Sequence, residues 1–212
     1  MKDYPNVTIF HHPLIQHKVA ILRDKDTGTK DFRELVEEIT ALMTFECLKD
    51  VPTRKIMVTT PLEKTEQTIV IENSVAIVPV LRAGLGMVNG VHRLFPTAKV
   101  GHIGMYRDEE TLQPKEYYCK LPDGIEDKIT IILDPMLATG GSANAAIDLL
   151  KKRGCRDIRL MNIIAAPIGV ETVKEAHPDV KVFIACLDRQ LNERGYILPG
   201  LGDAGDRLFG TK

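Results

Sequence analysis

The sequence predicts an α/β fold in which helices flank an open, mainly parallel sheet. Apolar runs rich in β-branched residues alternate with segments of helical periodicity through the middle of the chain, and this alternation is typical of βαβ units. Of the 212 residues, 44% are hydrophobic and 27% are charged, as in ordinary globular proteins. We therefore expect a single domain with a sizeable core over residues 1–212.

Charge and targeting signals exclude several classes of protein. The net charge of −1 gives no bulk attraction to nucleic acid or to anionic membranes. No apolar run approaches the roughly 20 residues of a membrane span, and the first residues lack the apolar core of a signal peptide. The cysteines form no C-x-x-C pair, which favours reduced thiols: Cys47, Cys119, Cys155 and Cys186. These features predict a cytoplasmic protein that binds neither nucleic acid nor membrane.

The N-terminal part contains three histidines and a charged run that precedes a predicted helix. Its histidines lack metal-ligand spacing, so hydrogen-bonded or surface positions are favoured over a metal site: His11, His12 and His17. The charged run Arg23–Arg33 is typical of a solvated loop before a helix, although it could also place cations near a phosphate-bearing ligand. Asp31 and Glu34 have the spacing of a capping box. The stripe that follows favours core or subunit contact: Phe32, Leu35, Val36, Ile39, Leu42 and Met43.

A hairpin and a buried strand come next. Ile56–Thr60 and Thr68–Ile71 predict two short strands joined by a polar turn, which would project from the main sheet. Val75–Val80 is an apolar strand, and a helix to about Phe95 follows it.

Arg82 directly follows this strand in the stretch L-R-A-G-L-G-M. Gly84 and Gly86 would let the backbone approach a ligand. An arginine at a strand end beside glycines fits a polyphosphate; the alternative is an arginine that only pairs with a nearby carboxylate.

The next segment predicts a two-stranded arm at about residues 105–121. A strand over Ala98–Tyr106 is followed by the polar excursion Arg107–Pro114, and a returning strand spans Lys115–Leu121. Such an arm could fold over a site as a lid. Arg107, where the arm leaves the sheet, is a second candidate cation; the alternative is a solvated arm without a functional role.

The stretch from Lys128 to Arg153 organises the chain. Ile129–Leu133 predicts a fully buried strand. Asp134 follows it, suited to accept hydrogen bonds from sugar hydroxyls. The loop then offers Thr139 and Ser142 as hydroxyl donors, Gly140 and Gly141 as exposed backbone donors, and a helix N-terminus. This pattern predicts a ribose-phosphate site, although a turn that needs glycine and a capping hydroxyl would look similar. It is not a Walker loop, since it has no lysine.

After this stretch, Ile158–Ala165 and Val180–Leu187 predict strands around a short helix over Gly169–Ala176. The tail, about residues 191–212, spells G-x-G-x-x-G, but too little chain follows for a dinucleotide-binding unit. We expect a structured loop whose backbone reads the edge of a base such as uracil, and cytosine would then place a donor against a donor. The alternative is a frayed, glycine-rich terminus.

Four motifs in this order resemble the uracil phosphoribosyltransferase family, within the type I phosphoribosyltransferases. They are V-L-R-A-G-L-G-M (80–87), M-Y-R-D-E-E-T-L (105–112), L-D-P-M-L-A-T-G-G-S (133–142) and G-Y-I-L-P-G-L-G-D-A-G-D (195–206). The resemblance covers nearly the whole chain. It implies the type I phosphoribosyltransferase fold, with a C-terminal hood over the base. It also implies transfer of the phosphoribosyl group of 5-phosphoribosyl 1-diphosphate (PRPP) to uracil, giving UMP and pyrophosphate, with Mg²⁺.

The resemblance also assigns site residues. Those implied to bind PRPP are Arg82, Arg107, Asp134, Pro135, Met136, Leu137, Ala138, Thr139, Gly140, Gly141, Ser142 and Asp203. Those implied to bind uracil are Ile197, Gly202, Asp203 and Ala204. Arg107 and Asp203 are the implied catalytic residues. Mg²⁺ is expected to be held mainly through PRPP, with Asp203 as the candidate protein contact.

Two departures and several alternatives accompany this resemblance. Leu133 precedes Asp134 where related enzymes carry a second acid, and the segment 187–195 leaves the roles of Arg189 and Arg194 open. The resemblance suggests a homodimer or larger homo-oligomer and a GTP effector, for which Arg23–Arg33 is a candidate site. Rival functions are a purine or orotate enzyme on the same fold and a PRPP-fold regulator that binds RNA, which the near-neutral charge disfavours.

Overall fold

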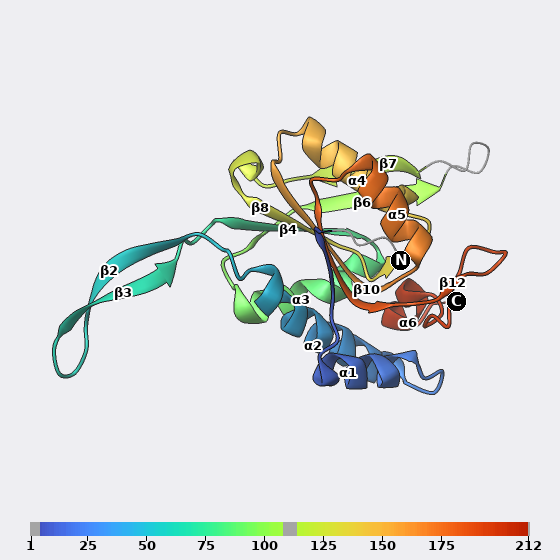
Figure 1. Cartoon of the computed structure of the whole chain (residues 1–212), viewed down its shortest axis with the longest axis horizontal. Helices are drawn as coiled ribbons and strands as arrows, with labels where there is room; N and C mark the ends of the chain where they lie inside the picture. Colours follow the sequence, from blue (N-terminus) through green and yellow to red (C-terminus); the bar gives the residue numbers. More distant parts are fainter. Residues whose placement is uncertain (1–4, 108–113, 212) are drawn as a thin grey trace.

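The computed structural model describes residues 5–107 and 114–211 (Figure 1). Its centre is a nine-stranded sheet in the order β1-β11-β10-β8-β4-β6-β7, with β5 beside β4 and β9 beside β10. The strands are β1 (Val7–Ile9), β4 (Val75–Leu81), β5 (Lys99–Val100), β6 (His102–Arg107), β7 (Pro114–Lys120), β8 (Ile129–Leu133), β9 (Met136–Leu137), β10 (Asp157–Ala165) and β11 (Lys181–Leu187). All pairs are parallel except β6 with β7, so the predicted fold class is confirmed.

Helices cover both faces of this sheet (Figure 1). The helical elements are α1 (Pro13–Arg23), α2 (Thr29–Cys47), the 3₁₀ helix η1 (Ala83–Met87), α3 (Val88–Leu94), the 3₁₀ helix η2 (Ile125–Asp127), α4 (Gly141–Lys152), α5 (Pro167–Ala176) and α6 (Ala204–Phe209). Helices α1, α2, α3 and α6 share one apolar core with the sheet, and α4 and α5 share the other. In β8, Ile131 and Leu133 face the first core and Ile132 the second, which explains the uninterrupted apolar run.

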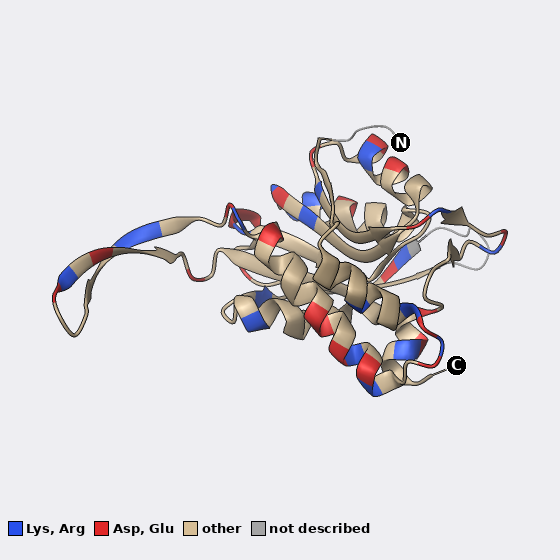
Figure 2. Cartoon of the chain, turned by 60° about the horizontal axis from the view of Figure 1, so that its bottom comes forward, with Lys and Arg blue, Asp and Glu red and all other residues tan. Residues whose placement is uncertain are grey.

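Two small sheets lie outside the main one. Strands β2 (Thr53–Thr59) and β3 (Lys64–Val70) form an antiparallel hairpin that projects far from the sheet, as the sequence predicts (Figure 1). Strands β12 (Gln190–Leu191) and β13 (Ile197–Leu198) form a short hairpin near the C-terminus. Figure 2 shows acidic and basic residues interspersed along the helices and on the projecting hairpin, in keeping with the small net charge.

The N-terminal expectations need correction. Helix α1 was not predicted, and Arg23 is its last residue rather than part of a solvated loop. The capping box is also wrong: α2 begins at Thr29 with Gly28 as its N-cap, so Asp31 lies within the first turn and no side chain caps the helix. His12 does cap α1, because its Nδ1 accepts a hydrogen bond from the N–H of Leu14.

The strand expected over 98–106 is divided at Gly101 into β5 and β6, each of which pairs with β4.

The four cysteines are free thiols. In the described part of the chain, no helix combines the length and apolar character needed to cross a bilayer.

Candidate active site

The carboxyl ends of three neighbouring parallel strands bring the predicted site residues together. Strand β4 lies between β8 and β6, with Pro79 beside Leu133 and Leu81 beside Gly104. Arg82 and Asp134, which directly follow β4 and β8, therefore leave the sheet at one edge. Arg107 is the last residue of β6 at the same edge, and its side chain lies outside what the structure describes.

The close approach of these strand ends requires Gly84. A β-carbon at this position would lie 2.2 Å from the backbone oxygen of Leu133, a distance that real side chains do not reach. The turn after β4 is thereby pressed against the end of β8, one residue before Asp134. Gly84 thus serves the packing of two strand ends, whereas the sequence suggested that it lets the backbone approach a ligand.

The loop after Asp134 presents uncapped backbone donors. Gly140 is the N-cap of α4 with φ +88°, and no side chain accepts a hydrogen bond from the first turn of this helix. Within the described residues, the hydroxyls of Thr139 and Ser142 also make no hydrogen bond. Free N–H groups at the positive end of a helix of 12 residues favour an anion. The arrangement supports a phosphate site over the alternative of a merely capped turn.

Two supporting residues were not identified from the sequence. Asn162 of β10 is fully buried, and its side-chain amide donates a hydrogen bond of 2.7 Å to the backbone oxygen of Asp134. Gly169 lets α5 approach the phosphate loop, because a β-carbon there would lie 2.4 Å from the oxygen of Ala138. Asn162 could have been identified from the sequence, because it is a lone asparagine within an apolar strand, in M-N-I-I.

Asp134 is an unusual carboxylate. Desolvation disfavours its charged form and raises its pKa to about 7, and the N–H of Met136 at 3.4 Å offsets this only weakly. The residue before it, Leu133, is fully buried in the core of α1, α2 and α3. A second acid at position 133 would therefore enter an apolar core, which explains why the strand supplies one carboxylate instead of two.

Arg82 is held only loosely. Its side chain is 58% exposed, and its Nη2 lies 3.4 Å from Oδ1 of Asp206. Its Nη1 lies 3.4 Å from the hydroxyl of Thr211, and its guanidinium lies 6.0 Å from the ring centre of Phe209. An exposed pair of this length contributes little stability. The alternative that Arg82 serves an ion pair alone is thus weakly supported, and the cation is accessible to a ligand.

The C-terminal segment is an ordered loop, so the alternative of a frayed terminus is wrong. β13 ends at Leu198, and the chain turns through Pro199 into α6. Gly202 has φ +81°. In the described part of the chain, its C=O and N–H and the N–H of Ala204 have no hydrogen-bond partner. This segment therefore offers a free acceptor and free donors side by side, and its assignment to uracil stays a prediction.

Asp203 lies between the C-terminal loop and Arg82. Its Oδ1 accepts a hydrogen bond of 2.9 Å from the N–H of Asp206 and caps α6. A β-carbon at Gly205 would lie 3.2 Å from this oxygen and 3.7 Å from Nη2 of Arg82. Asp203 and Arg82 therefore flank the same glycine. Ile197, the remaining predicted base contact, is buried in the core beneath the loop.

Arg189 and Arg194 lie outside this arrangement. Both are exposed on the β12–β13 hairpin, and only their backbone N–H groups make hydrogen bonds, to Leu198 and Asn192 respectively. Neither side chain makes a hydrogen bond or an ion pair with another described residue.

Comparison with known proteins identifies the family. The family model described as uracil phosphoribosyltransferase matches residues 9–211. The chain is 59% identical over 207 residues to a uracil phosphoribosyltransferase of Oceanobacillus iheyensis, covering 98% of this chain and 99% of that one. It is 61% identical over 206 residues to the enzyme of Halalkalibacterium halodurans, covering 97% and 99%.

Solved structures show the same type of fold. An Aquifex aeolicus protein superposes with a TM-score of 0.91 at 39% identity, covering 96% of this chain and 97% of that one. A hypoxanthine-guanine phosphoribosyltransferase of Bacillus anthracis has a TM-score of 0.50 at 11% identity over 76% of this chain and 80% of that one, a likeness of fold alone. From these matches over nearly its full length, the chain belongs to the uracil phosphoribosyltransferase family of pentosyltransferase enzymes.

Proposed function

We propose that this chain transfers the phosphoribosyl group of PRPP to uracil at the carboxyl edge of its sheet, in pyrimidine salvage. One observation carries the assignment of the site: the uncapped N-terminus of α4, the exposed Arg82 and the free backbone groups of Gly202 and Ala204 all meet at this edge. The first suits a phosphate, the second a diphosphate and the third a base. These are the three parts that the reaction has to bring together.

PRPP would be held along the loop 134–142. The 5′-phosphate would accept hydrogen bonds from the residues between Ala138 and Ser142, and Asp134 would accept them from the ribose hydroxyls. Arg82 and Arg107 would contact the diphosphate from the other side of the sugar. Two cations at the leaving group stabilise the negative charge that develops there, and this is the largest contribution we assign to the protein.

Uracil would lie against the loop that begins at Ile197. Its N1 forms the new bond to C1′ while the bond from C1′ to the diphosphate oxygen breaks, so N1 has to lie on the opposite face of the sugar. The proton on N1 has to leave. The second carboxylate oxygen of Asp203 has no partner in the described chain and is our candidate acceptor. The arm formed by β6 and β7 would exclude water; its tip, residues 108–113, lies outside the described residues.

Magnesium would be held mainly by the substrate. The described residues include no cluster of three or more ligating side chains, which fits an ion bound by phosphate oxygens with one or two carboxylates. Asp203 is the residue that would contact it. The ion would neutralise charge on the diphosphate.

A direct assay tests this assignment. Formation of UMP from uracil and PRPP should require Mg²⁺, and removal of the ion with a chelator should abolish turnover. Orotate and hypoxanthine should not be used as substrates. Calorimetry should detect PRPP binding in the presence of Mg²⁺. Turnover with a purine base instead of uracil would contradict the assignment.

The proposed assembly is a homodimer or larger homo-oligomer. Apolar side chains of α1, α2 and α3 are exposed on one surface, with Leu14 at 54%, Phe45 at 78% and Leu94 at 52%. The β2–β3 hairpin projects without a core of its own, and isolated two-stranded hairpins are marginally stable in water. Light scattering on purified protein measures the assembly directly.

The segment Arg23–Arg33 gives little support to a GTP site. Arg23 turns into the protein, and Arg33 donates a hydrogen bond to the backbone of Leu208. The hollow beside this segment is lined by Asp24, Asp26 and Asp31, whose charges disfavour a triphosphate. A GTP effector and a cytoplasmic location both stay predictions, to be checked by titration of GTP into the assay and by cell fractionation.

A further inference from the structure

Arg23 reaches from the end of α1 to the loop that we assign to uracil. Its Nη1 donates hydrogen bonds to the backbone oxygen of Gly200 at 2.7 Å and to Oδ2 of Asp188 at 2.9 Å. Its Nη2 contacts Oδ1 of Asp188 and, at 3.3 Å, the sulfur of Cys186. The Arg23 side chain is 19% exposed and that of Asp188 is 3% exposed, so the ion pair is largely shielded from water.

Asp188 holds Gly200 through its other backbone group. Its own N–H donates a hydrogen bond of 2.8 Å to the oxygen of Ala165, which ties it to the end of β10. Its Oδ2 accepts a hydrogen bond of 2.9 Å from the N–H of Gly200. Both backbone groups of Gly200 are therefore held by one ion pair, two residues before Gly202.

A second arginine holds the next carbonyl. Nη1 of Arg207, in α6, donates to the oxygen of Leu201 at 2.9 Å and to that of Leu22 at 2.8 Å. The guanidinium also lies 4.4 Å from the ring centre of Phe32. The oxygens of Gly200 and Leu201 are thus both fixed by arginines that join the loop to the end of α1. The groups of Gly202 that follow are free.

We propose that Arg23 and Asp188 are positioning residues for base recognition, which set the direction of the free C=O of Gly202 and the free N–H groups beside it. The inference rests on the proposed assignment of the 197–204 loop to uracil. Neither side chain contacts the substrate. Arginine is required because its planar fork donates to a carboxylate and to a carbonyl at once, whereas a lysine offers one compact charge.

The test compares kinetic constants of three variants: Arg23→Gln, Arg23→Lys and Asp188→Asn. Arg23→Gln and Asp188→Asn should raise the KM for uracil about tenfold, a free-energy change typical of losing one well-placed hydrogen bond to a charged group. Arg23→Lys should recover part of this loss. The affinity for PRPP, measured by calorimetry, should stay within about twofold, since the side chains of Arg23 and Asp188 make no hydrogen bond to the described residues 134–142. Discrimination against cytosine should fall.

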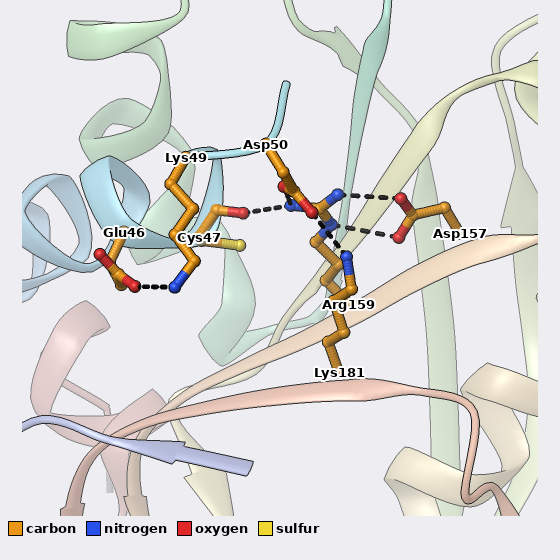
Figure 3. A network of polar contacts seen from close by, with 7 residues as sticks. All are labelled: Glu46, Cys47, Lys49, Asp50, Asp157, Arg159 and Lys181. Carbon is orange, nitrogen blue, oxygen red and sulfur yellow. Dashed lines mark hydrogen bonds and ion pairs between the residues drawn. The ribbon is translucent and has the colours of Figure 1, made fainter. Parts of the chain in front are cut away.

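A matched control separates positioning from general loss of stability. Arg159 is also buried and paired with carboxylates (Figure 3). It lies near the amino end of β10, whereas the loop 197–204 follows the carboxyl ends of the strands. Arg159→Gln should lower the melting temperature and leave the KM for uracil unchanged. If Arg159→Gln raised this KM as much as Arg23→Gln does, or if the Arg23 and Asp188 variants kept the normal KM, the positioning role would be wrong.

Gly202→Ala distinguishes failure of this inference from failure of the underlying assignment. Its φ of +81° makes any side chain unfavourable, so the substitution should disturb the loop itself and raise the KM for uracil. If Gly202→Ala left this KM unchanged, the loop would not be the uracil site. If it raised the KM while Arg23→Gln and Asp188→Asn did not, only the positioning role would fail.

Discussion

Arg159 at the amino end of β10 and Arg82 at the carboxyl end of β4 are the same residue type at opposite edges of one sheet. Arg159 is 2% exposed and donates to both oxygens of Asp157 at 3.1 and 2.8 Å, to Asp50 at 2.5 Å and to the backbone oxygen of Cys47 (Figure 3). Lys181 adds a second cation to Asp50 at 2.7 Å. Arg82 has one carboxylate at 3.4 Å and is 58% exposed.

The difference in pairing between Arg159 and Arg82 indicates that residues for stability and residues for ligand binding lie at opposite ends of the strands. At the amino edge all three nitrogens of the Arg159 guanidinium group have a protein partner, so the cluster joins the end of α2 to the sheet. Arg82, at the carboxyl edge, has only contacts of 3.4 Å with Asp206 and Thr211 and stays accessible to a ligand. Active sites generally show this incomplete internal pairing, because a ligand is meant to complete it.

Arg159→Gln should give the largest effect on stability. Removing one partner of a buried ion pair typically costs about 3–5 kcal/mol, and we expect about 3 kcal/mol because Asp50 and Asp157 are 48% and 41% exposed and can regain water. Denaturant unfolding measures this loss. The kinetic constants at 25 °C should not change; a large fall in turnover of the folded variant would break the proposed separation of the two edges.

Arg82→Ala and Arg107→Ala should show the opposite pattern. Each should lower turnover about 100-fold, near 3 kcal/mol in the barrier, because a cation at the leaving group acts mainly in the transition state. Arg93→Ala is the matched control for Arg82, since Arg93 is 59% exposed and pairs with Glu37 at 3.2 Å. All three should melt close to the parent protein. Near-normal turnover of the Arg107 variant would remove that residue from the site.

Asp134→Asn should weaken PRPP binding about tenfold in calorimetry, because an amide accepts hydrogen bonds from sugar hydroxyls less well than a carboxylate. Its effect on stability should depend on pH. The raised pKa of Asp134, about 7, means that the folded state favours the protonated form, so the stability it contributes is present at acid pH and is lost as pH rises through about 7.

The ligand-free variant should therefore be more stable than the parent at pH 8, by about 1–2 kcal/mol, with the advantage shrinking at pH 6. Melting curves at the two pH values check the sign. A variant with unchanged PRPP affinity would remove Asp134 from the ribose site, whatever its stability.

Asp50→Asn should give the smallest effect. Burial alone would raise the pKa of Asp50, but hydrogen bonds from Lys181 and Arg159 outweigh this and lower it to about 2. A pKa that is lower in the folded state stabilises the protein at pH values above the pKa of the unfolded chain, near 4. This stabilisation is lost as the pH falls through about 2. We expect a loss of about 1 kcal/mol at pH 7, reduced by solvent screening, and a much smaller difference from the parent at pH 2. Equal losses at both pH values would contradict a charge-based role.

Prediction from sequence succeeded where local pattern and chemistry agree. The apolar run 129–133, the following acid and the hydroxyl- and glycine-rich loop indicate a strand, a ligand contact and a helix N-terminus, and the structure has β8 and α4 there. Arg82 could be placed beside Asp134 because parallel strands end at the same edge. Helix α1 was missed, and Arg23 was assigned to a solvated loop because it begins a run of charges.

The sequence by itself determined the alternation of strands and helices, the family and the candidate ligand contacts, because these depend on periodicity and on residue type at short spacing. Only the tertiary structure decided which charges are used internally. Arg23, Arg159 and Arg207 find their partners 165, 109 and 185 residues away in sequence, and no local pattern encodes such a distance. For the loop 134–142 the sequence predicts a phosphate site, and the tertiary structure adds that its donors have no partner in the described chain.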